Sequence, residues 1–75
     1  MPRLPQVDGR RVLRALRRAG WEVIRVHGSH HVLNHAERPG ATLVVPVHRR
    51  PLKKGTLADI LEQAGLAIDE FKDLL

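Results

Sequence analysis

A short stretch of the chain, Gly28-Ser29-His30-His31, has the residue types best suited to chemistry. Imidazole titrates near neutral pH, so a histidine can accept or donate a proton under physiological conditions. The surrounding chain is strongly basic, and cations stabilise the negative charge that develops on a phosphate group during its cleavage. These residues therefore favour proton transfer at a phosphodiester, with His30 as the candidate general base or acid.

Cleavage of RNA needs few catalytic groups from a protein, because RNA carries its own nucleophile, the 2′-hydroxyl. Cleavage needs a base that removes the proton of the 2′-hydroxyl, an acid for the leaving oxygen and cations near the phosphate. The candidate RNA-binding residues are Gly28, Ser29, Arg49, Arg50, Lys53 and Lys54. The glycine-serine turn would bring the backbone close to the phosphate, and the Ser29 hydroxyl either donates a hydrogen bond to it or only forms the turn.

The other four histidines support weaker interpretations. His31 points to the opposite face of a regular strand from His30, so at most one of them serves a given site. His48 is either a second proton-transfer group or a solvated, substrate-contacting residue, and His27 and His35 are expected to be surface residues at strand ends. A histidine at a strand start is by itself more often a surface or hydrogen-bonding residue than a catalyst.

A metal site has little support in the sequence. His31 and His35 are four residues apart, which places them about 13 Å apart along one face of a strand. The chain has no cysteine, and no acidic cluster lies near these histidines. Lys54-Gly55-Thr56 lacks the preceding glycine-rich loop that a phosphate-binding P-loop needs. We therefore expect no metal and no small-molecule cofactor.

The charge of the chain, +5 overall, is unevenly distributed. Residues 1–54 hold 12 of the 13 lysines and arginines and three of the eight acidic residues, a balance of +9, whereas residues 55–75 have a balance of −4. A basic body of this kind attracts polyanions, of which nucleic acid is the commonest in a cell. The alternative is a solvated basic surface with an acidic final segment that meets a basic partner.

The length and composition limit the organisation of the protein. A chain of 75 residues forms one domain, residues 1–75, near the lower limit for a self-sufficient core. The absence of cysteine excludes disulfides and thiol catalysis and fits a reducing compartment. No apolar run approaches the roughly 20 residues that cross a bilayer, and the N-terminus lacks the apolar core of a signal peptide. We therefore expect a cytoplasmic protein without membrane contact.

Local signals predict a helix followed by three strands. Asp8 is the expected N-cap of a helix over residues 9–19, and Gly20 is its expected stop. Apolar, β-branched and aromatic residues then predict extended segments over residues 21–27, 30–35 and 41–47. Gly28-Ser29 is the expected turn of a hairpin, and Pro46, which has no N–H to donate, favours an edge position for the third strand.

Two further helices are predicted after the strands. Gly55-Thr56 opens the first of them, with Thr56 as its cap and Gly65 at its end, and the second begins near Ala67. The expected fold class is therefore α+β, in the order αβββαα, with a three-stranded antiparallel sheet and helices on one face. The other face of so small a sheet has no helix left to cover it and is open to solvent or to a partner.

Five short motifs along the chain match one family in order and spacing. They are Gly20-Trp21 after a basic helix, Gly28-Ser29-His30-His31, Val45-Pro46-Val47-His48, Lys54-Gly55-Thr56-Leu57, and Ala64-Gly65-Leu66 with Phe71. In these motifs the chain resembles the HicA-type (YcfA-like) mRNA interferase toxins of type II toxin-antitoxin systems. The resemblance covers nearly the whole chain.

That resemblance implies a fold similar to the double-stranded-RNA-binding domain, in agreement with the element order above. It also implies an endoribonuclease that cleaves translated mRNA and is held inactive by a HicB-type antitoxin protein. In this family the catalytic histidine directly follows the glycine-serine pair, which in this chain makes it His30.

Two other classes of function remain open on the residues alone. A non-catalytic RNA-binding module would depend on Lys53 and Lys54 but not on His30, and a protein-binding module would have no affinity for RNA at any salt concentration. The chain has one tryptophan, one phenylalanine and no tyrosine, so base stacking cannot be its main way of holding a single strand. We expect recognition of RNA to be mostly electrostatic.

Overall fold

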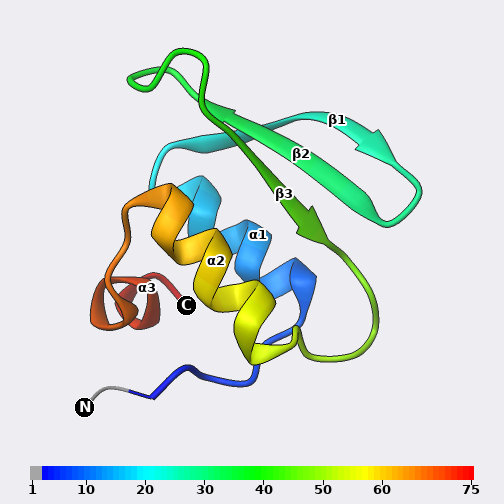
Figure 1. The fold of residues 1–75 in the computed structure, drawn as a ribbon, viewed down its shortest axis with the longest axis vertical. Helices are drawn as coiled ribbons and strands as arrows, with labels where there is room; N and C mark the ends of the chain where they lie inside the picture. The colour runs from blue at the N-terminus through cyan, green and yellow to red at the C-terminus, as the bar shows by residue number, and fades with distance from the viewer. Residues whose placement is uncertain (1–2) are drawn as a thin grey trace.

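Three antiparallel strands form one sheet, and helices pack against one of its faces (Figure 1). The computed structural model describes residues 3–75; residues 1 and 2, part of the segment expected to lack a signal peptide, lie outside the described residues. In chain order the elements are α1 Gly9–Arg18, β1 Trp21–His27, β2 His30–His35, β3 Thr42–Pro46, α2 Lys54–Ala64 and α3 Ile68–Leu74. This αβββαα order confirms the predicted α+β class.

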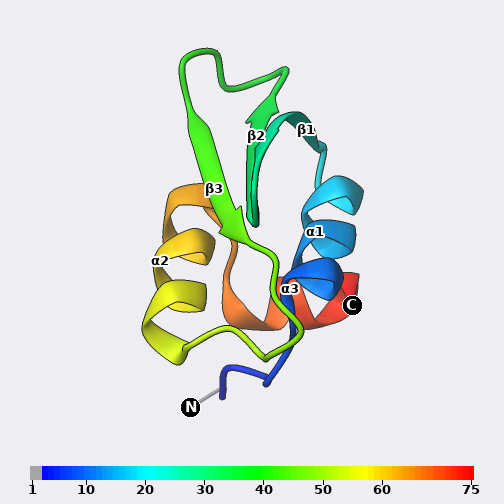
Figure 2. The same ribbon diagram turned by 90° about the vertical axis from the view of Figure 1, so that its right-hand side faces the viewer.

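The sheet has the strand order β1-β2-β3, so β2 is central and the other two strands are edges. Helix α1 contacts β1 and β3, α2 contacts β3, and α3 lies beside α1 (Figure 2). Within residues 3–75 no element covers the opposite face of the sheet. The prediction of an open face is confirmed, as is the edge position of the strand that ends at Pro46.

Helix α1 begins and ends as its sequence signals predict. The Asp8 carboxylate accepts a hydrogen bond from the Arg11 backbone N–H at 3.0 Å, which satisfies one of the amides that the first turn leaves free. Gly20 follows the Ala19 C-cap with a φ of 99°, a conformation that costs a residue with a Cβ about 1–2 kcal/mol. Helix α1 is therefore bounded by local chemistry at both ends.

Strands β1 and β2 form a hairpin around Gly28 and Ser29. The φ of Gly28 is 57°, whereas that of Ser29 is not positive, the pattern of a type II′ turn with glycine at the first central position. Farther from the turn, Val23 pairs with Leu33 and Arg25 pairs with Val32, so Ile24 is an extra residue that forms a β-bulge. The sequence predicted the hairpin but not the bulge.

The start of α2 differs from the prediction. The helix begins at Lys54 with Lys53 as its N-cap, so Thr56 lies inside the first turn and is not the cap. The Leu57 N–H already bonds the Lys53 carbonyl at 3.0 Å, which extends the helix ahead of Thr56. The Lys53 side chain makes no capping hydrogen bond within the described residues. The end of α2 is as predicted, with Gly65 as its C-cap.

Two long side chains close the ends of the second and third helices. The guanidinium of Arg38 donates to the Ala64 carbonyl at 2.9 Å, and that of Arg18 donates to the Leu74 carbonyl at 2.6 Å. Free carbonyls at a helix C-terminus carry partial negative charge, so a cation there is stabilising. These two arginines of the basic surface are thus engaged within the fold.

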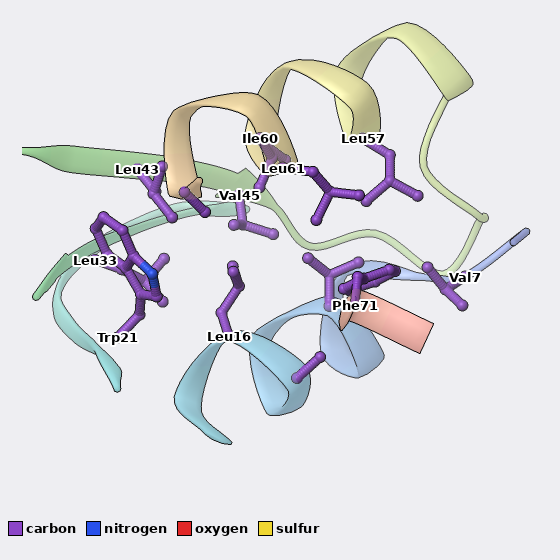
Figure 3. Packing of buried hydrophobic residues seen from close by; sticks show 13 residues of the cluster. Val7, Leu16, Trp21, Leu33, Leu43, Val45, Leu57, Ile60, Leu61 and Phe71 are labelled. Atoms are coloured by element: carbon purple, nitrogen blue, oxygen red, sulfur yellow. The ribbon is translucent and has the colours of Figure 1, made fainter. Parts of the chain in front are cut away.

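The core lies between the sheet and the helices (Figure 3). Its buried apolar residues come from every helix and strand and include Trp21, Leu33, Leu43 and Val45 from the sheet, Leu16 from α1, Leu57, Ile60 and Leu61 from α2, and Phe71 from α3.

None of the helices in residues 3–75 has the length and apolar character needed to span a lipid bilayer.

Candidate active site

The two histidines that follow the turn lie on opposite faces of the sheet, as predicted. His31 pairs with the fully buried Val45 and is itself half-buried, with Nδ1 3.4 Å from the Ser29 carbonyl oxygen. His30 pairs with Pro46 and is exposed. Since paired residues of antiparallel strands share a face, the His30 imidazole lies on the open face of the sheet.

His27 lies directly across the hairpin from His30. The two residues are Cα partners in the ladder, and both are exposed. Directly opposed residues of an antiparallel pair have Cβ atoms about 4.5–5.5 Å apart and point to the same side. His27 is therefore a surface residue, as expected, but its proximity to His30 was not predicted. The signal was present in the sequence, because a two-residue loop makes its flanking residues cross-strand partners.

An open pocket after β3 holds three of the four cations that were predicted to bind RNA. It is lined by Pro46, His48, Arg49, Arg50, Pro51, Leu52, Lys53 and Thr56. His30 itself does not line the pocket, but its Cα partner on β3, Pro46, does, as His27 is its partner on β1. Arg49, Arg50 and Lys53 belong to the pocket, whereas Lys54 is exposed in the first turn of α2 and does not line it.

The segment from Val47 to Lys53 is fixed at both ends. At one end, the Val47 N–H donates to the Ser29 carbonyl at 2.7 Å. At the other, the Leu52 N–H donates to the Val7 carbonyl at 2.8 Å, beside an isolated antiparallel bridge between Asp8 and Pro51. This loop, which passes the start of α1 in Figure 2, therefore holds its cations at a defined place relative to the turn before His30.

His35 has a structural role, and the prediction that it is a surface residue is wrong. It is half-buried, its Nε2 lies 3.0 Å from the Ala19 carbonyl oxygen, and its Nδ1 accepts the Glu37 N–H at 3.1 Å. Because Nδ1 accepts, the ring proton lies on Nε2 and is donated to the C-cap of α1. The ring also packs edge-on against Trp21, with centroids 5.2 Å apart. His35 therefore joins the end of α1 to the end of β2.

In a comparison with protein families, one family model matches most of the chain. The model that matches is that of the HicA toxin of bacterial toxin-antitoxin systems, and the match covers residues 9–66. The chain belongs to the HicA toxin family. It is thus the toxin of a toxin-antitoxin system, and an antitoxin is its implied partner. No curated protein shows a significant match to the chain.

The matched region of this HicA toxin contains the whole candidate site. It runs from the first residue of α1 to the residue after the α2 C-cap, so it includes the hairpin and the loop from Val47 to Lys53. Helix α3 lies outside the match but completes the core, since Phe71 is fully buried. Within residues 3–75 of the toxin, no three histidine, aspartate or glutamate side chains gather as metal ligands would.

Proposed function

We propose that this toxin is a metal-independent endoribonuclease that cleaves mRNA in the cytoplasm and so inhibits translation, with His30 as a general acid or base. Family membership supports the toxin role. The observation that supports the catalytic role is that His30 is exposed and pairs with Pro46, a residue that lines the same pocket as Arg49, Arg50 and Lys53. An imidazole beside clustered cations is what cleavage of RNA requires.

The proposed reaction is an attack by the RNA on its own backbone. A general base removes the proton of a 2′-hydroxyl, and the oxygen attacks the adjacent phosphorus to form a 2′,3′-cyclic phosphate. The bond from phosphorus to the 5′-oxygen of the next nucleotide breaks, and a general acid protonates that oxygen. Arg49, Arg50 and Lys53 stabilise the charge on the phosphate oxygens, and Lys54, at the start of α2, contacts the RNA backbone outside the pocket. Gly28 and Ser29 bring their backbone to the phosphate.

His27 is the residue best placed to manage the second proton. It shares the exposed face with His30 as its direct cross-strand partner, whereas His48 lies on the loop after β3. Two imidazoles on one face allow one to act as base while the other acts as acid. We therefore assign the proton transfers to His27 and His30 and a phosphate-contacting role to His48.

The first experiment tests His30 with a matched control from the same strand and face. Wild-type toxin, His30→Ala and Asn34→Ala are each incubated with a long mRNA in EDTA, and the fragments are separated. Asn34 is exposed and lies on the His30 face of β2. We expect His30→Ala to lose about 10²–10⁴-fold in cleavage rate, while Asn34→Ala keeps its rate.

The alternative function is a non-catalytic RNA-binding module that uses the same cations. In that case wild-type toxin and His30→Ala bind RNA equally and neither cleaves it, whereas Lys53→Ala weakens binding. Equal cleavage by the wild type and His30→Ala would place the chemistry elsewhere. The expected HicB-type antitoxin provides a second check, because addition of that protein should suppress cleavage by the wild type.

An activated substrate separates the two histidines. A nucleoside 3′-phosphodiester with a 4-nitrophenolate leaving group needs little or no protonation of the departing oxygen. The variant that lacks the general acid should therefore recover most of its rate on this substrate, while the variant that lacks the general base should not. If His27→Ala cleaves both substrates at the wild-type rate, His27 takes no part in the reaction.

A further inference from the structure

A second open pocket shares His48 and Arg49 with the pocket after β3 described above. It is lined by Asp8, Arg10, Val47, His48 and Arg49, and therefore joins the start of α1 to the loop after β3. We propose that this pocket is a second phosphate subsite, which holds an RNA backbone phosphate next to the scissile one and has Arg10 as its main cation. The inference rests on the proposed function and assigns a role to a residue outside the site described above.

Close packing of α1 on the loop brings Arg10 to this position. Gly9 is buried, and a Cβ built on it would lie 2.5 Å from the Pro46 carbonyl oxygen and 2.7 Å from the Val47 Cα. Only a residue without a side chain lets the first turn of α1 approach the backbone of Pro46 and Val47 so closely. The next residue, Arg10, is exposed and lines the pocket together with Arg49.

Both pockets adjoin the hairpin turn through neighbouring residues. The first pocket includes Pro46, the partner of His30, and the second includes Val47, which donates a hydrogen bond to Ser29. An RNA strand with its scissile phosphate at His30, as the proposed function has it, can therefore reach both pockets. The cations of the second pocket are arginines, whose planar guanidinium groups match phosphate oxygens with two parallel hydrogen bonds.

Asp8 is the acidic residue of the second pocket and makes the proposal testable in both directions. Its carboxylate accepts a hydrogen bond from the Arg11 N–H as the N-cap of α1, and this bond fixes the carboxylate in the pocket. Its charge opposes a phosphate there. Asparagine is an equally good N-cap without the charge, so Asp8→Asn should keep the helix and strengthen binding of RNA.

The test measures binding of a short single-stranded oligoribonucleotide as a function of salt. Each variant is made in His30→Ala, which prevents cleavage. A single phosphate contact contributes about 0.7 to the slope of log affinity against log salt, so loss of one contact lowers affinity about fivefold at 0.1 M salt. We expect this from Arg10→Ala, while Arg10→Lys keeps the slope and Asp8→Asn raises the affinity.

Arg14→Ala is the matched control, because Arg14 is exposed on the same helix but does not line the pocket. Equal slopes for Arg10→Ala and Arg14→Ala would overturn the subsite, as would an Arg10→Ala toxin that binds RNA normally and loses only affinity for its antitoxin. Failure of the proposed function gives a different result from failure of the subsite. If the toxin is not a ribonuclease, the wild type leaves mRNA intact, but the salt dependence of binding still shows whether Arg10 contacts a phosphate.

Discussion

In the substitution Gly9→Ala, helix propensity and tertiary packing predict opposite changes in stability. Alanine is the better helix former, by about 1 kcal/mol in a helix interior, so propensity alone predicts a small gain in stability. The structure predicts the opposite. Both atoms nearest the new Cβ belong to the backbone, namely the Pro46 carbonyl oxygen at 2.5 Å and the Val47 Cα at 2.7 Å, so neither can turn away as a side chain would.

The size of the effect follows from the displacement required. Ordinary contact begins near 3.4 Å, so the Pro46 oxygen and the new methyl group must separate by about 0.9 Å. Overpacking of a well-packed interior costs about 1–3 kcal/mol, and part of the helical preference is recovered. We expect a net loss of about 1–2 kcal/mol in the free energy of unfolding, which lowers the Tm of a domain of this size by roughly 5–15 °C.

The assay is thermal and urea denaturation of Gly9→Ala beside Gly55→Ala. Gly55 is also in the first turn of a helix, but a Cβ there would meet nothing within 4 Å, so its replacement should raise stability by about 0.5–1 kcal/mol. Opposite signs for the two variants are the expected result. If Gly9→Ala is stabilised like Gly55→Ala, the close packing of α1 on Pro46 and Val47 is refuted, and with it the placement of Arg10.

Three further substitutions test contacts that join distant parts of the chain, each by urea denaturation. His35→Ala should lose about 1–3 kcal/mol, because the Ala19 carbonyl and the Glu37 N–H lose their partner; an unchanged midpoint would mean that these bonds contribute nothing. Arg38→Ala should lower the free energy of unfolding by about 1 kcal/mol, because the Ala64 carbonyl at the C-terminus of α2 loses its hydrogen bond. If replacement of an exposed arginine elsewhere by alanine costs as much, Arg38 does not cap α2. Gly20→Ala should lose more than about 1 kcal/mol, since its φ is 99° and its Cβ would lie 2.5 Å from the His35 Nε2; a neutral result would count against this conformation.

The element order could be predicted because its signals are local. Asp8 caps α1, Gly20 ends it, and Gly28-Ser29 closes the hairpin, each through bonds or torsions within a few residues. The prediction that Thr56 caps α2 was wrong because a long-range contact, and not a local signal, sets the start of this helix. Threonine favours an N-cap, but the chain before it is anchored by the bond from Leu52 to Val7, and α2 begins as soon as that segment ends.

The candidate site could be predicted only in part, because its parts meet through long-range contacts. Residue types alone select His30 and the cations after β3 as candidates for phosphodiester chemistry. Their proximity depends on the pairing of His30 with Pro46, 16 residues later. The role of His35 likewise depends on a carbonyl 16 residues earlier, and that of Arg38 on one 26 residues later. No local pattern encodes these distances.

The bulge in β1 affects how readily the edge of the sheet can pair with a second chain. An edge strand offers unpaired N–H and C=O groups to any other chain, and β1 also exposes Ile24 and Val26 by about half, at 51% and 52%. The bulge at Ile24 twists this edge, and Arg25 adds a charge beside it. At the other edge, Pro46 removes a donor from β3. Each edge strand of the sheet thus carries a feature that disfavours edge-to-edge pairing with another copy of the toxin.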